Sequence, residues 1–385
     1  MTFVAAGCSS ESKPSGGGVP TSLALSCTTT TTADAGGARA LIEGSSSGAC
    51  VVLPAGSYAG PFKVPAGVAL VAQDGARATV TGGTAQDPAV TLGEGSQLAN
   101  VDVVGATGVA IAVRAASAVV SDVTVTGAKN AALAVLCREG CAAGVVALNR
   151  VTLTKSSLGL WVSGAHVVWK EGASSNHAGT GLASASGVVA QDGANLEMTN
   201  VMVEKNEGTG VLIDGEATTA SIKDVTVSEN SERGVWAQRI SGTLDKPSLK
   251  LEGCQLTKNR IVGVGALESH GIIIVSGRIA DTVAAPLVTN LESTESVGDG
   301  VGIFSSGDFK LEGSLIENNA RTAGVIDGSD RGIIIVSGKV GPTSSLKFVV
   351  QNTKGGDVQV VDSDRSIAGK ILGISAPRLV LPPVL

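Results

Sequence analysis

The chain has 385 residues, a formal net charge of −6 at pH 7 and 16% charged residues. Lys and Arg are outnumbered by Asp and Glu and form no cluster, which excludes the basic surface that a nucleic-acid partner requires. The 52 glycines and 2% aromatic residues are typical of short strands joined by tight turns, and no apolar run approaches the about 18 residues of a membrane-spanning helix. The composition favours an all-β protein.

The chain begins MTFVAAGCSSESKPSGGG, in which small residues precede Cys8 and a Ser, Gly and Pro segment follows it. This stretch resembles the end of a bacterial lipoprotein signal followed by a flexible tether. The resemblance implies lipidation of Cys8, with membrane attachment only through that lipid anchor. The alternative is that Cys8 is an ordinary residue of a disordered segment.

The cysteines that follow suggest an oxidising compartment. Cys27 and Cys50 flank the first ordered segment, and Cys137 and Cys141 lie four residues apart in the loop sequence LCREGCAAG. Two disulfides are the economical interpretation for an exported protein. No His or second Cys pair lies near Cys137 in the sequence, so we predict no metal site there.

An eight-residue pattern recurs through the middle of the chain. LKLEGCQL (249–256) is repeated as FKLEGSLI (309–316), and the same frame fits 96–103, 118–125, 146–153, 196–203 and 220–227. Apolar or small residues alternate with polar ones, which is the period of a strand with one buried face. The inward anchors of the seven frames are Val101, Val123, Val151, Val201, Val225, Cys254 and Ser314.

The spacing of these anchors predicts a solenoid. Successive anchors are 22, 28, 50, 24, 29 and 60 residues apart, and two of these gaps are double. A unit of 22 to 30 residues that supplies several short strands is one coil of a repeat protein. Because Cys254 stands where other coils have Val or Ser, we expect a small buried residue there; the alternative is a nucleophile.

Asparagines form a second repeat. Asn206, Asn230, Asn259 and Asn319 each follow their anchor by five residues. Asn tolerates left-handed backbone geometry, and its amide can satisfy the buried backbone groups of a corner. In stacked coils we expect these amides to form a ladder.

With these repeats the chain resembles a right-handed parallel β-helix of the pectate-lyase-like superfamily, from about Cys50 to Val361. The entry VVLPAGSYAGPFKVPAGVALVAQDG (51–75) looks like the first coil of exported members, after a capping helix within 33–44. The resemblance implies a tether at 1–26, a β-helix at 27–368 and an apolar, Pro-broken C-terminal cap at 369–385. A β-sandwich or propeller is the rival fold, but aromatic blade motifs are lacking.

A longer duplication lies near the end of the solenoid. ESHGIIIVSGRI (268–279) returns as SDRGIIIVSGKV (329–340), so 250–340 contain a two-coil duplication. Both GIIIVSG copies should stand in line on one side, two coils apart. Such an apolar run is a core strand buried on both faces or, alternatively, an edge that pairs with a second copy to form a homo-oligomer.

The sequence lacks the paired motifs of polysaccharide-cleaving relatives. Hydrolases of this fold place two carboxylates across the bond, and no Asp-Asp pair occurs here. Lyases need carboxylate ligands for Ca²⁺ and a base near the α-proton. The charges that could stack across coils are mixed in sign and suggest a solvated face: Glu204, Lys205, Asp214, Asp224, Lys223, Glu229, Glu232 and Arg233. We therefore predict no catalytic residue and no cofactor, with Ca²⁺ needed only if the protein is a lyase.

One polar and aromatic group remains as a candidate glycan-binding site, because sugar rings stack on aromatic faces. Within it Trp161 alternates as a strand residue and is a candidate for the core, whereas Trp169, beside two charged residues, is expected to be exposed. The group consists of Trp161, His166, Trp169, Lys170, Glu171 and His177.

These observations favour a non-enzymatic cell-envelope protein, structural or adhesive and able to bind glycans. The alternative is a polysaccharide lyase or glycoside hydrolase of the same superfamily. The expected partners are polysaccharide or envelope proteins, without nucleic acid. The expected location is exported: an outer-membrane or cell-surface lipoprotein, or the periplasm.

Overall fold

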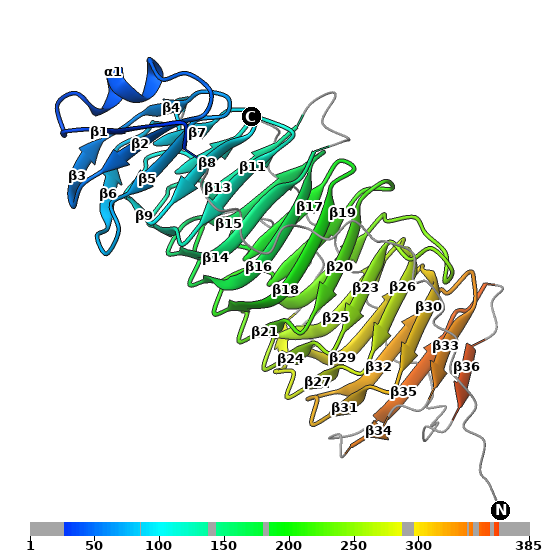
Figure 1. Ribbon diagram of the computed structural model, residues 1–385. Helices are drawn as coiled ribbons and strands as arrows, with labels where there is room; N and C mark the ends of the chain where they lie inside the picture. Colours follow the sequence, from blue (N-terminus) through cyan, green and yellow to red (C-terminus); the bar gives the residue numbers. More distant parts are fainter. Residues whose placement is uncertain are drawn as a thin grey trace, which may run out of the picture.

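The computed structural model describes residues 27–84, 86–137, 144–179, 185–286, 296–336, 339–341, 346–354 and 358–361. In this part the chain winds into a right-handed parallel β-helix (Figure 1). The all-β solenoid predicted from the repeats is confirmed.

The larger sheet, here called sheet A, bends in the middle, so most coils cross it as two short strands or one long one. Its strands are β1 (Thr29–Thr32), β2 (Ala49–Leu53), β3 (Gly56–Ala59), β5 (Ala69–Ala72), β6 (Ala78–Thr81), β8 (Ser96–Ala99), β9 (Val101–Val104), β11 (Ala118–Ser121), β12 (Thr124–Thr126), β14 (Val146–Thr154), β16 (His166–Ser175), β18 (Asn195–Glu204), β20 (Thr219–Lys223), β21 (Thr226–Ser228), β23 (Leu249–Glu252), β24 (Gln255–Thr257), β26 (His270–Val275), β27 (Arg278–Ala280), β30 (Gly307–Glu312), β31 (Leu315–Glu317), β33 (Ile333–Val336), β34 (Lys339–Val340) and β36 (Val358–Val361).

The second sheet, sheet B, closes the solenoid with one parallel strand from each coil. Its strands are β4 (Phe62–Val64), β7 (Val90–Leu92), β10 (Ile111–Val113), β13 (Ala131–Leu136), β15 (Leu158–Ser163), β17 (Val188–Gln191), β19 (Val211–Asp214), β22 (Arg233–Gln238), β25 (Ile261–Leu267), β29 (Ser296–Phe304), β32 (Thr322–Asp327) and β35 (Leu346–Gln351), with the short β28 (Ala285–Pro286) antiparallel to β29.

The strand register agrees with the sequence repeat. Ala220 pairs with Leu249, and Leu249 pairs with Ile272 in the next coil. In the two double gaps, the coil without a sequence match carries glycine at the anchor: Gly172 lies in register between Val151 and Val201. The same register places Gly277 between two anchors, and its N–H donates to Ser314 Oγ at 3.1 Å. Both double gaps therefore hold one complete extra coil.

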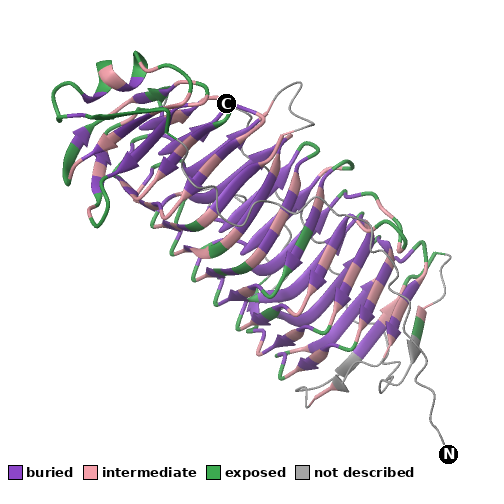
Figure 2. Ribbon diagram, viewed as in Figure 1, coloured by how far each residue is buried: buried purple, intermediate pink, exposed green. Residues whose placement is uncertain are grey.

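Aliphatic side chains fill the interior between the two sheets. Most strand residues are buried, as the colouring of the ribbon shows (Figure 2). Every anchor is buried, and Cys254 is 1% exposed, with burial raising the pKa of its thiol. The prediction that Cys254 is a small core residue, rather than a nucleophile, is confirmed.

A short helix and a disulfide close the N-terminal end. Helix α1 (Ala38–Glu43) lies within the predicted segment 33–44 and packs Ala38 and Ile42 against the first coil. Cys27 and Cys50 form the expected disulfide. Cys137 is also disulfide-bonded; its expected partner Cys141, like Cys8 and the cap predicted at 369–385, lies outside the described residues.

The predicted asparagine ladder is present from Asn206 to Asn259, and Asn319 lies two coils further on, where its Oδ1 accepts the Thr282 N–H at 3.1 Å. Asn206 Nδ2 donates to Asn230 Oδ1 at 2.9 Å, and Asn230 Nδ2 donates to Asn259 Oδ1 at 2.8 Å. The backbone N–H groups of Asn206 and Asn230 donate to the same acceptors. All these side chains are fully buried. The ladder thus satisfies polar backbone that the tight corner leaves without a strand partner.

The GIIIVSG strands, β26 and β33, stand two coils apart on sheet A, as predicted, with β30 between them. The alternative of an unpaired edge is wrong, because β26 also pairs with β23 and β33 also pairs with β36. Burial on both faces is wrong as well: Ile272 and Ile274 point inward, whereas Ile273 is half-buried on the outer side. Contact of these strands with a second copy stays a prediction.

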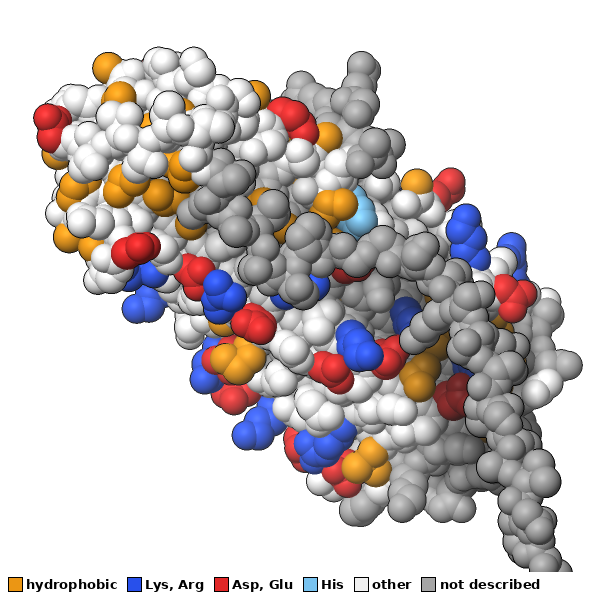
Figure 3. Space-filling view, in the orientation of Figure 1, with side chains coloured by type: hydrophobic (Ala, Val, Ile, Leu, Met, Phe, Trp, Pro, Cys, Tyr) orange, Lys and Arg blue, Asp and Glu red, His pale blue; other side chains and the backbone are white. Residues whose placement is uncertain are grey.

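Charges of both signs alternate along the solenoid surface (Figure 3). Arg77 pairs with Asp102 and Arg150 with Asp122 across neighbouring coils. Such exposed pairs contribute little stability. In the ranges given above, no helix has the length and hydropathy to cross a membrane.

Candidate functional site

The six residues predicted as a glycan site do not share one surface. Trp161 lies on β15 in sheet B. His166, Trp169, Lys170 and Glu171 lie on β16 in sheet A. His177 lies inside the corner that follows β16 and is fully buried. Neighbours within one coil thus point in different directions, because a coil turns through both sheets.

The expectation that Trp169 is exposed is wrong. Its indole is 0% exposed and lies inside the solenoid, in register between Leu148 and Met198. Nε1 donates to the Glu171 carbonyl at 3.1 Å. A Cβ built on Gly172 would lie 3.0 Å from that nitrogen and 2.1 Å from the Val151 carbonyl oxygen. Glycine at the anchor therefore leaves the space that the indole fills. Because the seven anchors of the sequence repeat are Val, Cys or Ser, this coil does not match it.

His177 belongs to the ladder. It follows Gly172 by five residues, as Asn206 follows its own anchor. Nδ1 accepts the Ser156 N–H at 3.2 Å, so Nε2 carries the proton and donates to Ser174 Oγ at 3.0 Å. Burial lowers the pKa of His177 to about 4. The imidazole is therefore neutral at pH 7, and its two nitrogens are both occupied by hydrogen bonds within the corner.

The other members of the group lie on the outer side of sheet A. His166 Nε2 contacts Glu197 Oε1 at 2.9 Å on the next coil. Lys170 is partly buried and Glu171 is exposed. No indole shares this surface with them in the described residues, because Trp161 and Trp169 point elsewhere. The structure therefore does not bring the two indoles of the group together with His166, Lys170 and Glu171.

A different surface carries two aromatic rings. On the outer face of sheet B the register brings Trp161, Val189, Leu212 and Trp236 side by side on β15, β17, β19 and β22. We call these four residues the apolar column. Trp161 is 2% exposed and Trp236 is 1% exposed. Two indoles thus lie on one face three strands apart, a distance of about 14 Å at the usual strand spacing.

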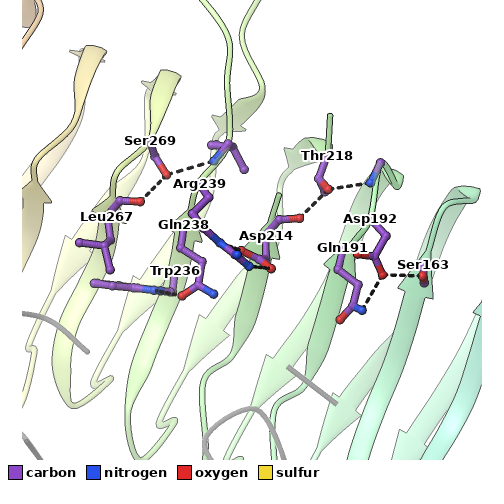
Figure 4. Close-up of polar contacts among 12 residues, drawn as sticks. Ser163, Gln191, Asp192, Asp214, Thr218, Trp236, Gln238, Arg239, Leu267 and Ser269 are labelled. Atoms are coloured by element: carbon purple, nitrogen blue, oxygen red, sulfur yellow. Dashed lines mark hydrogen bonds and ion pairs between the residues drawn. The ribbon is translucent and has the colours of Figure 1, made fainter. Parts of the chain in front are cut away.

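Polar residues line the carboxyl end of the same four strands. Ser163, Gln191, Asp214 and Gln238 follow one another in register, and we call them the polar row (Figure 4). Gln238 Oε1 accepts the Trp236 Nε1 proton at 3.1 Å, which joins the row to the apolar column.

Two charged residues at the sheet edge extend the polar row into solvent. Ser163 Oγ and Gln191 Nε2 donate to Asp192 Oδ2 at 2.9 and 2.7 Å. Arg239 Nε donates to Asp214 Oδ1 at 2.9 Å, and this bond raises the pKa of Arg239. Asp214 is 2% exposed, whereas Asp192 and Arg239 are exposed. Both residues leave the sheet in left-handed conformations, with φ of 56°.

Buried polar atoms without partners gather on this face. They are Trp161 Nε1 in the apolar column, Gln191 Oε1 in the polar row, and Ser186 Oγ and Arg233 Nε at the amino end of the strands. Arg233 lies over the Trp236 ring at 4.6 Å, and burial lowers the pKa of Arg233 and raises that of its partner Glu232. A buried polar atom without a partner costs about 1–3 kcal/mol. These atoms are therefore poised to bind a hydroxyl-rich or charged ligand.

The expectation that Asp214 and Arg233 lie on a solvated face is wrong, because both side chains are buried on sheet B. The polar row has one member from each of four coils, so its members are more than twenty residues apart in the chain. Applying the coil period to outward positions, as was done for the anchors, would have aligned them. No group of three or more metal-ligating side chains occurs among the described residues.

The comparisons with known proteins agree with this class of fold. Residues 107–279 match a family model described as a right handed beta helix region. No curated protein sequence matches the chain. Among solved structures it is similar to the mannuronan C-5 epimerase AlgE4 A-module of Azotobacter vinelandii, with 16% identity, a TM-score of 0.54, and 87% of this chain and 94% of that chain covered.

A second similar structure is the periplasmic alginate epimerase AlgG, with 10% identity, a TM-score of 0.57, and 82% and 77% of the two chains covered. At these identities the likeness establishes the fold alone. The protein is a right-handed parallel β-helix protein, and in its described residues the outer face of sheet B carries the apolar column and the polar row.

Proposed function

We propose that this protein binds a polysaccharide that runs along the solenoid axis over the outer face of sheet B, from β15 to β22. The observation that carries the proposal is the polar row, with the exposed Asp192 and Arg239 at its end, beside the apolar column. The two indoles of the column are 2% and 1% exposed, so they can stack on a sugar only when the face is uncovered. A sugar ring has an apolar face that stacks on an indole and a rim of hydroxyls that needs donors and acceptors.

A second candidate is a lyase-type reaction on a uronate polymer, favoured by the charges at the end of the polar row. Arg239 lies beside Asp214 and within the field of Asp192. A guanidinium can neutralise a sugar carboxylate, which acidifies the adjacent C5 proton, and Asp192 is an exposed carboxylate able to remove it. The electron pair would form the C4–C5 double bond as the C4–O glycosidic bond breaks, and the departing oxygen would take a proton from water. The two similar structures are a mannuronan C-5 epimerase module and an alginate epimerase, which supports a polysaccharide as the ligand class.

The proposed location is outside the cytoplasm. The Cys27–Cys50 disulfide is consistent with an oxidising compartment. Lipidation of Cys8 would hold the solenoid at a membrane surface, where polysaccharide binding would make it an adhesive or structural envelope protein. Mass spectrometry of the protein from a bacterial host's envelope would detect the lipid on Cys8; an unmodified Cys8 would contradict the anchor.

The test is a binding panel of polyuronates and neutral glycans, read by calorimetry, with products followed by reducing ends and by ultraviolet absorbance of unsaturated uronates. In Asp214→Asn/Arg239→Gln both charges are removed together, so no buried carboxylate is left unpaired. We expect at least ~10-fold weaker binding, because a charge-assisted hydrogen bond contributes about 1.5–3 kcal/mol.

The control is Lys250→Gln/Glu252→Gln, which removes an ion pair on sheet A. Binding with unchanged polymer would support recognition alone, whereas unsaturated products would support the lyase reaction. Equal binding by the two double variants would place the polysaccharide elsewhere.

A further inference from the structure

The outer face of sheet B is buried, in contrast to that of sheet A. Leu212 is 0% exposed and Val325 is 1% exposed, although both point outward from sheet B. On sheet A the outward Met202 is 48% exposed and Val104 is 40% exposed. The buried outward residues form one continuous cluster along the sheet, which includes Val109, Ala134, Leu158, Trp161, Val189, Leu212, Trp236, Leu267, Phe304 and Val325.

The elements of the solenoid do not account for this burial. Between β13 and β25, no helix or strand in the described ranges packs across the outer face of sheet B, because each strand contacts adjacent coils and its neighbours along the chain. An apolar face of this length in water would be a strong site of association. A covering segment is therefore needed.

We propose that residues 362–385 dock on the outer face of sheet B and cover the apolar column. This segment has nine large aliphatic residues among its 24. Its last part, RLVLPPVL, contains two adjacent prolines, so it suits side-chain packing on a sheet face better than strand pairing at an edge. The other long segment outside the described residues, 1–26, has no large apolar side chain between Ala5 and Gly18.

The length of the segment is sufficient. The last described strand, β36, ends at Val361 in the final coil. From β32 back to β13 the face spans seven strand spacings, or about 34 Å. A chain of 24 residues reaches up to about 80 Å when extended. Residues 362–385 can therefore return along the whole apolar face with slack for the turn.

The cover would also regulate the proposed polysaccharide site, and this consequence alone rests on the proposed function. Trp161 Nε1, Gln191 Oε1 and Arg233 Nε are buried on this face without a hydrogen-bond partner. A polysaccharide that displaced the cover and bonded to these atoms would gain hydrogen bonds that are otherwise unmade. Cover and polysaccharide are therefore competitors for one face.

The first experiment places the photo-cross-linking residue p-benzoylphenylalanine at Leu212 or, separately, at Val189 in the full chain. We expect intramolecular cross-links to peptides from 362–385. Met202 with the same substitution is the control and should give none. Cross-links from both sheet B positions to 1–26 or to a second molecule, or no protein cross-link at all, would overturn the proposal.

The second experiment loosens the cover with Leu379→Asp/Leu381→Asp in the full chain. We expect acrylamide quenching of the tryptophans to rise at least ~2-fold, because Trp161 and Trp236 become accessible, while a Trp161→Phe/Trp236→Phe background that retains buried Trp169 shows no rise. Unchanged quenching would contradict the docking.

Polysaccharide binding by Leu379→Asp/Leu381→Asp should be at least ~10-fold tighter than by the unaltered chain. If cross-links and quenching behave as expected but neither protein binds any polysaccharide, the docking stands and the proposed function fails.

Discussion

His177 occupies the ladder position that asparagine holds in other coils, and its chemistry differs from theirs only in that it can be protonated. Protonation would place a charge inside the solenoid, where Ser156 N–H already donates to Nδ1. The folded pKa of about 4 lies below the value near 6.5 expected for an unfolded chain. The unfolded state therefore binds more protons between these two values, and the contribution of His177 to stability falls as the pH falls through this window.

His177→Asn should remove this pH dependence. An asparagine can accept the Ser156 N–H as Asn206 accepts the His177 N–H. We expect similar stability at pH 7 and, at pH 5, an advantage of about 2 kcal/mol over the unaltered protein, measured by urea unfolding. His166→Asn, on the outer side of sheet A, is the matched control and should show no such advantage. Parallel pH profiles for His177→Asn and the unaltered chain would contradict this assignment.

Asn230 is the best-connected rung of the ladder. Its Oδ1 accepts two protons from Asn206, and its Nδ2 donates to Asn259 Oδ1 and to the Val203 carbonyl. Asn230→Ala removes these four hydrogen bonds and leaves the buried N–H and Nδ2 of Asn206 without their acceptor, so we expect a loss of about 3 kcal/mol in the free energy of unfolding. Ser231→Ala, at an exposed neighbouring position, should change it by less than about 0.5 kcal/mol. Comparable losses in the two variants would mean that the ladder is not a source of stability.

At the scale of elements, β16 shows how one large side chain is fitted into a narrow solenoid. Trp169 takes an inward position that Met198 and Leu148 hold in adjacent coils. The following anchor is glycine with φ of 131°, a conformation that favours glycine over residues with a Cβ. The backbone conformation of Gly172 and the position of the Trp169 indole therefore both require glycine at this anchor.

Gly172→Ala should therefore be strongly destabilising. The new Cβ would meet the Val151 carbonyl oxygen at 2.1 Å, and the backbone would have to leave its present φ. We expect a loss of about 3 kcal/mol, measured by thermal and urea unfolding. Gly332→Ala is the control, since its Cβ would find open space. A small effect at Gly172 would show that the coil relaxes around the indole.

At the scale of the whole molecule, each coil contacts only its neighbours, so stability is approximately a sum over coils and interfaces. The first coil has a neighbour on one side only, and the Cys27–Cys50 disulfide ties β1 to β2 at that end. The ends of such a solenoid are its weakest parts unless they are capped.

Cys27→Ser/Cys50→Ser should loosen that end alone. Closing a loop of 23 residues removes about 3 kcal/mol of chain entropy from the unfolded state. Hydrogen exchange should quicken in 29–53 while β15 to β25 keep their protection. Faster exchange throughout the solenoid would show that the coils unfold as one cooperative unit.

The sequence by itself determined the solenoid, its register and its ladder. Inward positions repeat in every coil because the same narrow interior selects them, so Val225, Cys254 and Ser314 could be aligned without coordinates. Glycine anchors hid two coils, and for that reason Trp169 and His177 were predicted as ligand-binding residues when both are buried in the interior.

Only the tertiary structure decided which residues form the candidate site. Outward positions carry no common requirement of packing, so their residue types do not repeat. Ser163, Gln191, Asp214 and Gln238 come from four separate coils, and only the register of the coils aligns them. Winding brings them to one edge because parallel strands in register place equivalent positions about 5 Å apart. A cluster of polar and aromatic residues in the sequence contains residues of one coil. The surface of a β-helix, by contrast, is formed by residues of successive coils, which are far apart in the sequence.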